Sequence, residues 1–197
     1  MILTRWALKG NIFTMTFELP YFVFGAILCV FAGAVLADRR ASRKIALLDW
    51  NDLVAALYRL DMVELSAVAM DYLAPHRGQI DMEPKEIWEF LGGYEGLKRM
   101  RENAEIMLAL AAYAQRWNFE EAVIVTERMR LDAASLRRAI RRVELGMIPV
   151  SLLRHFRLTL PLHAQEASSA YYLMRQRLLA LYETSHVCRY PTLAAAL

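Results

Sequence analysis

Three pairs of side chains, each an acidic residue with another acidic residue or a histidine three positions away, are candidates for metal binding. This spacing puts both side chains on one face of a helix, where they could bind a metal ion. The pairs are Glu86 with Glu89, Glu102 with Glu105, and His163 with Glu166. Di-iron sites in helical bundles need a Glu-x-x-His motif from each of two helices, and the chain does not carry two such motifs. We therefore predict no metal site.

A histidine and a cysteine near the C-terminus could act as base and nucleophile. His186 and Cys188 have no neighbouring acid to orient the base and no glycine-rich turn to stabilise an oxyanion. Gly92-Gly93 lacks the flanking strand and the lysine of a phosphate-binding loop. We therefore predict no catalytic residue and no cofactor. The alternative is a helical enzyme whose site is assembled from scattered residues.

Arginine is concentrated on one segment, and its planar group suits phosphate and carboxylate partners. The candidate contacts for an anionic partner are Arg128, Arg130, Arg137, Arg138, Arg141 and Arg142. Anionic lipid or an acidic protein fits this pattern, whereas nucleic acid is not expected because no recognised binding motif accompanies the charge. The alternative is pairing within the chain, since residues 45–121 carry 14 acidic and 7 basic side chains and residues 122–197 carry 5 and 11.

The pattern after residue 45 predicts helices and no sheet, because good helix formers dominate and no run alternates apolar with β-branched residues. Asp61 and Glu64 have the spacing of a helix N-terminal box, marking either a kink in one helix or a break between two. Pro84 suits the first position of a short helix that Gly92-Gly93 ends. The expected helices cover residues 49–60, 61–74, 84–91, 94–117, 118–147 and 162–185, with a connector at 149–161 and a docked tail.

The longest predicted helix, 118–147, begins at Asn118 and carries apolar residues at spacings of three and four. They are Val123, Met129, Ala133, Leu136, Ile140, Val143 and Met147. The pattern from Met129 to Met147 is heptad-like, so one face should be buried along the whole helix.

A 19-residue uncharged stretch, residues 19–37 (LPYFVFGAILCVFAGAVLA), precedes the helical part of the chain. As a helix it would reach about 28 Å, close to the ~30 Å hydrocarbon core of a bilayer. Ten of its residues are Leu, Ile, Val or Phe, which together favour insertion by roughly 3 to 6 kcal/mol. We predict a single transmembrane helix, in preference to a buried helix of a soluble domain.

Basic residues are more numerous after the apolar stretch than before it. Segment 39–44 holds four, whereas Arg5 and Lys9 are the basic residues upstream. The positive-inside rule therefore places residues 1–18 outside and residues 49–197 in the cytoplasm. A cleaved signal peptide ending at Ala37 is the alternative, and it would make the domain extracytoplasmic. The start of the chain is also open, because Met15 could begin translation.

Small residues recur every fourth position on one face of this stretch: Gly25, Cys29, Gly33 and Ala37. Such a stripe lets a second helix approach closely and could serve a homodimer or a membrane-protein partner. The alternative is that Gly and Ala are simply frequent in membrane helices.

The sequence thus predicts an all-α protein, with an N-terminal single transmembrane helix followed by an antiparallel bundle of four to six helices. Its expected parts are residues 1–18 outside the membrane, 19–37 within it, a basic linker 38–48 and a helical domain 49–197. The predicted function is a non-enzymatic interaction or scaffold module on the cytoplasmic face of the inner or plasma membrane, in contact with lipid.

Overall fold

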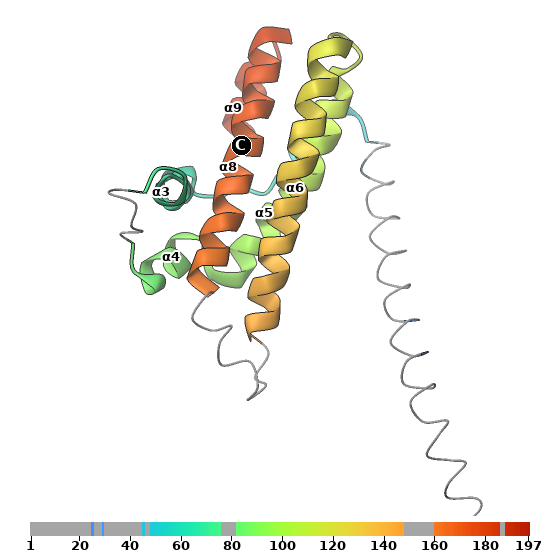
Figure 1. Ribbon diagram of the computed structural model, residues 1–197. Coiled ribbons are helices and arrows are strands. Elements are labelled where there is room, and N and C mark those ends of the chain that lie inside the picture. Colours follow the sequence, from blue (N-terminus) through green and yellow to red (C-terminus); the bar gives the residue numbers. More distant parts are fainter. Residues whose placement is uncertain are drawn as a thin grey trace, which may run out of the picture. The chain divides into compact units, whose positions relative to one another are not determined.

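The computed structural model describes residues 48–75, 82–147, 160–185 and 188–197, together with Gly25, Cys29 and Ile45. The chain divides between Leu47 and Leu48, and the fold described here is that of the second unit, Leu48–Leu197. In the described residues all regular structure is helical, which confirms the all-α class (Figure 1). The helices are α2 (Trp50–Ala55), α3 (Met62–Leu73), α4 (Pro84–Phe90), α5 (Gly93–Ala114), α6 (Phe119–Met147), α8 (Leu160–Ser185) and α9 (Tyr190–Ala196).

Three long helices, α5, α6 and α8, form the body of the bundle. Helices α5 and α6 are antiparallel, because Tyr94 at the start of α5 contacts Glu144 near the end of α6, while Gln115 just after α5 contacts Thr126 early in α6. Helix α8 lies beside α6 (Figure 1). The four shorter helices pack around these three, so the described residues hold seven helices where the sequence predicted four to six.

Helix α8 is the centre of the fold and packs against α3, α4, α5, α6 and α9. Its buried residues therefore extend around much of its circumference. The predicted inward positions are all buried: Ala167, Tyr171, Met174, Leu178 and Leu181. Small residues such as Ala164 and Ser168 are fully buried as well, and their size lets the neighbouring helices approach closely.

The heptad face of α6 is buried as predicted at Met129, Ala133, Leu136, Ile140 and Val143. Its last member, Met147, is 48% exposed because the helix ends there. At the other end the Asn118 side chain accepts a hydrogen bond from the Glu121 amide at 3.4 Å, the predicted N-terminal cap.

The first predicted helix is shorter than expected, since α2 ends at Ala55 instead of Leu60. The buried amide of Asn103 explains this: its Nδ2 donates to the Tyr58 carbonyl at 2.8 Å, and its Oδ1 accepts from the Tyr58 N–H at 2.8 Å. These bonds replace the helical partners that Tyr58 would otherwise need. Asp61 then caps α3 through the amides of Val63 and Glu64, so this position is a break between two helices.

The C-terminal tail docks against the bundle as predicted, and it does so as a helix. Pro191 lies in the first turn of α9, where its missing N–H costs nothing. Leu193 is fully buried and Leu197 is 8% exposed. This extra helix accounts for the count beyond six.

The predicted transmembrane stretch lies outside the described residues, apart from Gly25 and Cys29, which are helical and exposed. Gly33 and Ala37, the linker to residue 44 and the connector 148–159 are likewise outside them. Among the described residues, no helix has both the length and the apolar character needed to cross a bilayer.

Candidate functional site

The side of α6 away from its buried face exposes both apolar and charged side chains. We define the outer face as Glu120, Ile124, Glu127, Arg130, Leu131, Ala134, Arg138, Arg141, Arg142 and Leu145, all of them exposed. Ile124, Leu131 and Leu145 are 58%, 70% and 51% exposed. They lie seven and fourteen residues apart, so they form a second stripe, on the side of α6 away from its buried heptad face.

The six predicted arginines divide between pairing within the chain and exposure. Arg137 contacts Glu105 of α5 at 3.6 Å, and Arg142 contacts Glu166 of α8 at 3.3 Å. Arg130 pairs with Glu127 one turn earlier on the same helix. Exposed pairs of this kind contribute little to stability, about 0 to 1 kcal/mol each, so pairing leaves most of these side chains available to a partner.

The remaining three arginines have no carboxylate within ion-pair distance among the described residues. Arg138 donates to the carbonyl of Ala134 at 3.3 Å and to the Ser135 hydroxyl at 3.0 Å. Arg141 is exposed. Arg128 lies near Arg177, whose pKa is lowered by burial and by the repulsion of Arg128. On the outer face, Arg138 and Arg141 are thus without a carboxylate partner in the part of the chain that the structure describes.

A partly buried ion pair joins α6 to α8 on the other side of the helix. Asp132 and Arg177 are in contact, and their side chains are 17% and 31% exposed. Removing one partner of such a pair leaves an uncompensated, partly buried charge. The pair adds to the apolar packing that joins α6 to α8.

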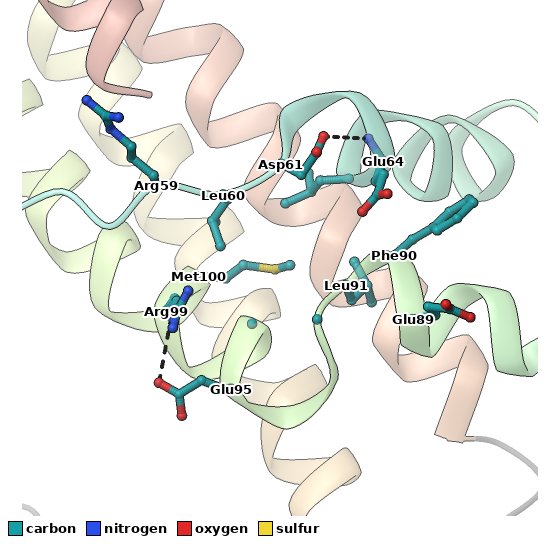
Figure 2. Close-up of a pocket in the computed structure, with 13 residues that line it drawn as sticks. Arg59, Leu60, Asp61, Glu64, Glu89, Phe90, Leu91, Glu95, Arg99 and Met100 are labelled. Carbon is teal, nitrogen blue, oxygen red and sulfur yellow. Dashed lines mark hydrogen bonds and ion pairs between the residues drawn. The ribbon is translucent and has the colours of Figure 1, made fainter.

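A hollow of about 370 Å³ lies where the segment before α3 meets the turn between α4 and α5 (Figure 2). Leu60, Leu65 and Met100 give it apolar walls, and six charged residues line it as well: Arg59, Asp61, Glu64, Glu89, Glu95 and Arg99. Figure 2 shows Glu95 and Arg99 joined, at 3.7 Å. Its lining combines these four carboxylates and two arginines with apolar side chains and contains no histidine, cysteine, serine or lysine.

The turn beside this hollow is shaped by glycine. Gly92 and Gly93 have φ of +67° and +64°, a conformation that other residues rarely adopt. At Gly96 an added Cβ would lie 1.6 Å from the Leu91 carbonyl oxygen. The sequence predicted that Gly92-Gly93 ends a helix. It did not predict the requirement for glycine at position 96, which arises because the backbone at the end of α4 approaches the first turn of α5 closely.

An aromatic cluster surrounds the guanidinium of Arg189, just before α9. Its carbon lies 4.8 Å from the ring centre of Trp50, 4.9 Å from that of Trp117 and 5.6 Å from that of Tyr113. Tyr182 packs against both tryptophans and donates to the Leu110 carbonyl at 3.0 Å. Cation–π attraction to three rings favours this placement, so the cluster attaches the C-terminal helix to α2 and α5.

The residues considered for metal binding do not converge. Glu105 pairs with Arg137, and Glu166 with Arg142 and His163. In the part of the chain that the structure describes, no three His, Cys, Asp or Glu side chains are grouped to hold an ion. One Glu-x-x-His does occur, from Glu183 to His186, but His186 lies outside the described residues. Cys188 is exposed.

Comparison with protein-family models, with curated proteins and with solved structures gave no match.

Proposed function

We propose that the protein is a single-pass membrane protein whose helical domain is a non-enzymatic interaction module on the cytoplasmic face of the inner or plasma membrane. The observation that carries the interaction role is the outer face of α6, where Ile124, Leu131 and Leu145 are at least half exposed beside unpaired arginines. Isolated exposed apolar residues are common, and what supports a contact surface here is their alignment on one side of the helix with arginines beside them.

Membrane anchoring is supported by the sequence of residues 19–37. Insertion of this stretch is favoured by several kcal/mol, and the basic residues of segment 39–44 set the proposed orientation. Gly25 and Cys29 are exposed, as the proposed packing stripe of Gly25, Cys29, Gly33 and Ala37 requires of its members. The competing proposal is a secreted helical domain released by cleavage after Ala37, which would carry the same α6 surface outside the cell.

Alkaline carbonate extraction of membranes containing the full chain tests the anchor. We expect the protein to stay in the membrane pellet. Leu28→Arg with Val30→Arg should release it, because two central arginines cost about 5 to 7 kcal/mol and cancel the gain from the rest of the stretch. Leu28→Val with Val30→Leu is the matched control and should stay in the pellet.

Two results would contradict the anchor. One is recovery of the unaltered chain in the carbonate supernatant. The other is an intact mass near that of residues 38–197 in place of the full 22.7 kDa, which would establish the cleaved and secreted form.

A further inference from the structure

The hollow beside the turn between α4 and α5 is lined by charges of both signs that do not pair across it. Arg59 and Arg99 lie on one side of the hollow (Figure 2). Glu64 and Glu89 lie on the opposite side. Among the described residues, the side chains of Arg59, Glu64 and Glu89 have neither an ion pair nor a hydrogen bond. Arg99 has Glu95 as a partner, but this pair is exposed and contributes little to stability.

Apolar side chains separate the two charged sides. Leu60, Leu91 and Met100 lie between them in Figure 2. Leu91 and Met100 are 3% and 1% exposed, so they are packed into the core, while Leu60 is half-buried. Opposite charges held apart over an apolar surface match a molecule that carries both charges with an apolar segment between them.

The hollow has the size of a small-molecule site. Its volume of about 370 Å³ lies near the lower end of the range of roughly 300 to 1,000 Å³ that is typical of such sites. Gly92 and Gly96 belong to its lining, so the chain adds backbone and no side chain at these two positions. The ligand that fits is therefore short, with few atoms beyond its two charged groups and the segment that joins them.

We propose that this hollow binds a small zwitterion with an apolar middle, of which an ω-amino acid is the simplest example. Its anionic group lies on the side of Arg59 and Arg99, its ammonium group on the side of Glu64 and Glu89, and its apolar chain over Met100. This inference goes beyond the proposed function, because no residue of α6 lines the hollow.

A ligand with a single kind of charge fits the hollow less well. A cation without an anionic group would be attracted by the carboxylates but repelled by Arg59 and Arg99. An anion without an ammonium group would be attracted by the arginines but repelled by Glu64 and Glu89. A zwitterion turned the right way is attracted at both ends.

Methyl NMR of the full chain, labelled at the methionine methyl groups and kept in a non-ionic detergent, tests the site with 6-aminohexanoate as the probe. We expect the Met100 resonance, assigned from Met100→Leu, to shift and saturate with a Kd on the order of 1 mM. The resonance of Met129, which is fully buried on α6, should not shift. If the Met100 shift does not saturate at about ten times that concentration, the site is overturned.

Blocked forms of the probe test the need for both charges. Methyl 6-aminohexanoate lacks the negative charge and 6-acetamidohexanoate lacks the positive one, so each should bind at least about tenfold more weakly. If either form binds as tightly as 6-aminohexanoate, one charge suffices and the zwitterion is the wrong class of ligand.

The ethanolamine headgroup of membrane lipid also carries both charges, on a shorter segment. O-phosphoethanolamine stands for this source, and it should bind more weakly than 6-aminohexanoate because it covers less apolar surface. Tighter binding of O-phosphoethanolamine would overturn the role of the apolar segment and assign the hollow to a lipid headgroup.

Removal of single charges from the chain supplies an independent test. Glu64→Gln and Arg59→Gln should each raise the Kd for 6-aminohexanoate about fivefold. Glu120→Gln and Lys98→Gln are the matched controls, since both are exposed and neither lines the hollow, and they should leave the Kd unchanged. An unchanged Met129 resonance reports that each variant is folded. Variants of Glu64 and Arg59 that bind as tightly as the unaltered chain would overturn the proposal.

Discussion

Replacing Asn103 by alanine should destabilise the domain by about 3 kcal/mol. The Asn103 side chain is 1% exposed and makes three hydrogen bonds: two to the Tyr58 backbone at 2.8 Å and one to the Tyr171 hydroxyl at 3.0 Å. Tyr171 is fully buried, so its hydroxyl would lose its Asn103 partner, at a cost of about 1 to 3 kcal/mol. The two bonds to Tyr58 contribute about 1 kcal/mol each, reduced where water reaches this partly buried backbone.

Tyr171→Phe is the matched control because it removes the hydroxyl and leaves Asn103 bonded to Tyr58. It should cost about 1 kcal/mol. In the Tyr171→Phe background, Asn103→Ala should cost roughly 1 kcal/mol less than in the unaltered chain, since no hydroxyl is then left without its partner.

The assay is urea unfolding of the full chain in mild detergent, followed by circular dichroism at 222 nm. Amide hydrogen exchange gives a second readout, since the Tyr58 N–H should exchange much faster in Asn103→Ala than in Tyr171→Phe. A cost below about 1 kcal/mol for Asn103→Ala, or costs of the two substitutions that simply add, would refute the role assigned to this amide.

Three further predictions concern stability in the same urea assay. Gly96→Ala should lower the free energy of unfolding by 3 kcal/mol or more, because its Cβ would overlap a carbonyl oxygen at 1.6 Å. Gly146→Ala is the control, since the nearest atom there is a leucine side-chain carbon at 3.2 Å. It should change stability by about 1 kcal/mol or less. Asp132→Ala should lower the free energy of unfolding by about 2 kcal/mol, because it leaves Arg177 unpaired. Adding Arg177→Met should recover most of this loss, since no unpaired charge then remains. If the double variant is no more stable than Asp132→Ala, this role of the pair is contradicted. Burial raises the pKa of Tyr182 to about 12, against 10.0 for a free tyrosine. The unfolded chain then loses this proton first, so the contribution of Tyr182 to stability should be constant well below pH 10 and fall by about 2 kcal/mol by pH 12. Tyr182→Phe should reduce that fall.

Much of the bundle follows from local sequence signals. The buried faces of α5, α6 and α8 repeat every three to four residues over many turns, and the ends of α3, α4 and α6 are marked by Asp61, Pro84 and Asn118. Each of these signals acts through neighbouring residues alone. They could therefore be read before any tertiary contact was known.

The features that escaped sequence analysis depend on contacts between distant residues. The early end of α2 is set by Asn103, 45 residues from Tyr58. The cluster around Arg189 joins Trp50, Tyr113 and Trp117 from two other parts of the chain. The second stripe of α6 was hidden for another reason: Ile124, Leu131 and Leu145 resemble core residues until burial identifies which face is already covered.

Labelling of Cys188 in intact cells with a membrane-impermeant maleimide tests the central claim, a single span with the helical domain inside, most directly. Cys188 is exposed in the fold, and Cys29→Ser leaves it as the sole cysteine of the two in the chain. Thr4→Cys, in a chain lacking both natural cysteines, is the control for the outer side. A single span with the helical domain inside predicts that Thr4→Cys reacts in intact cells and that Cys188 reacts only after the membrane is permeabilised. Reaction of Cys188 in intact cells would contradict it.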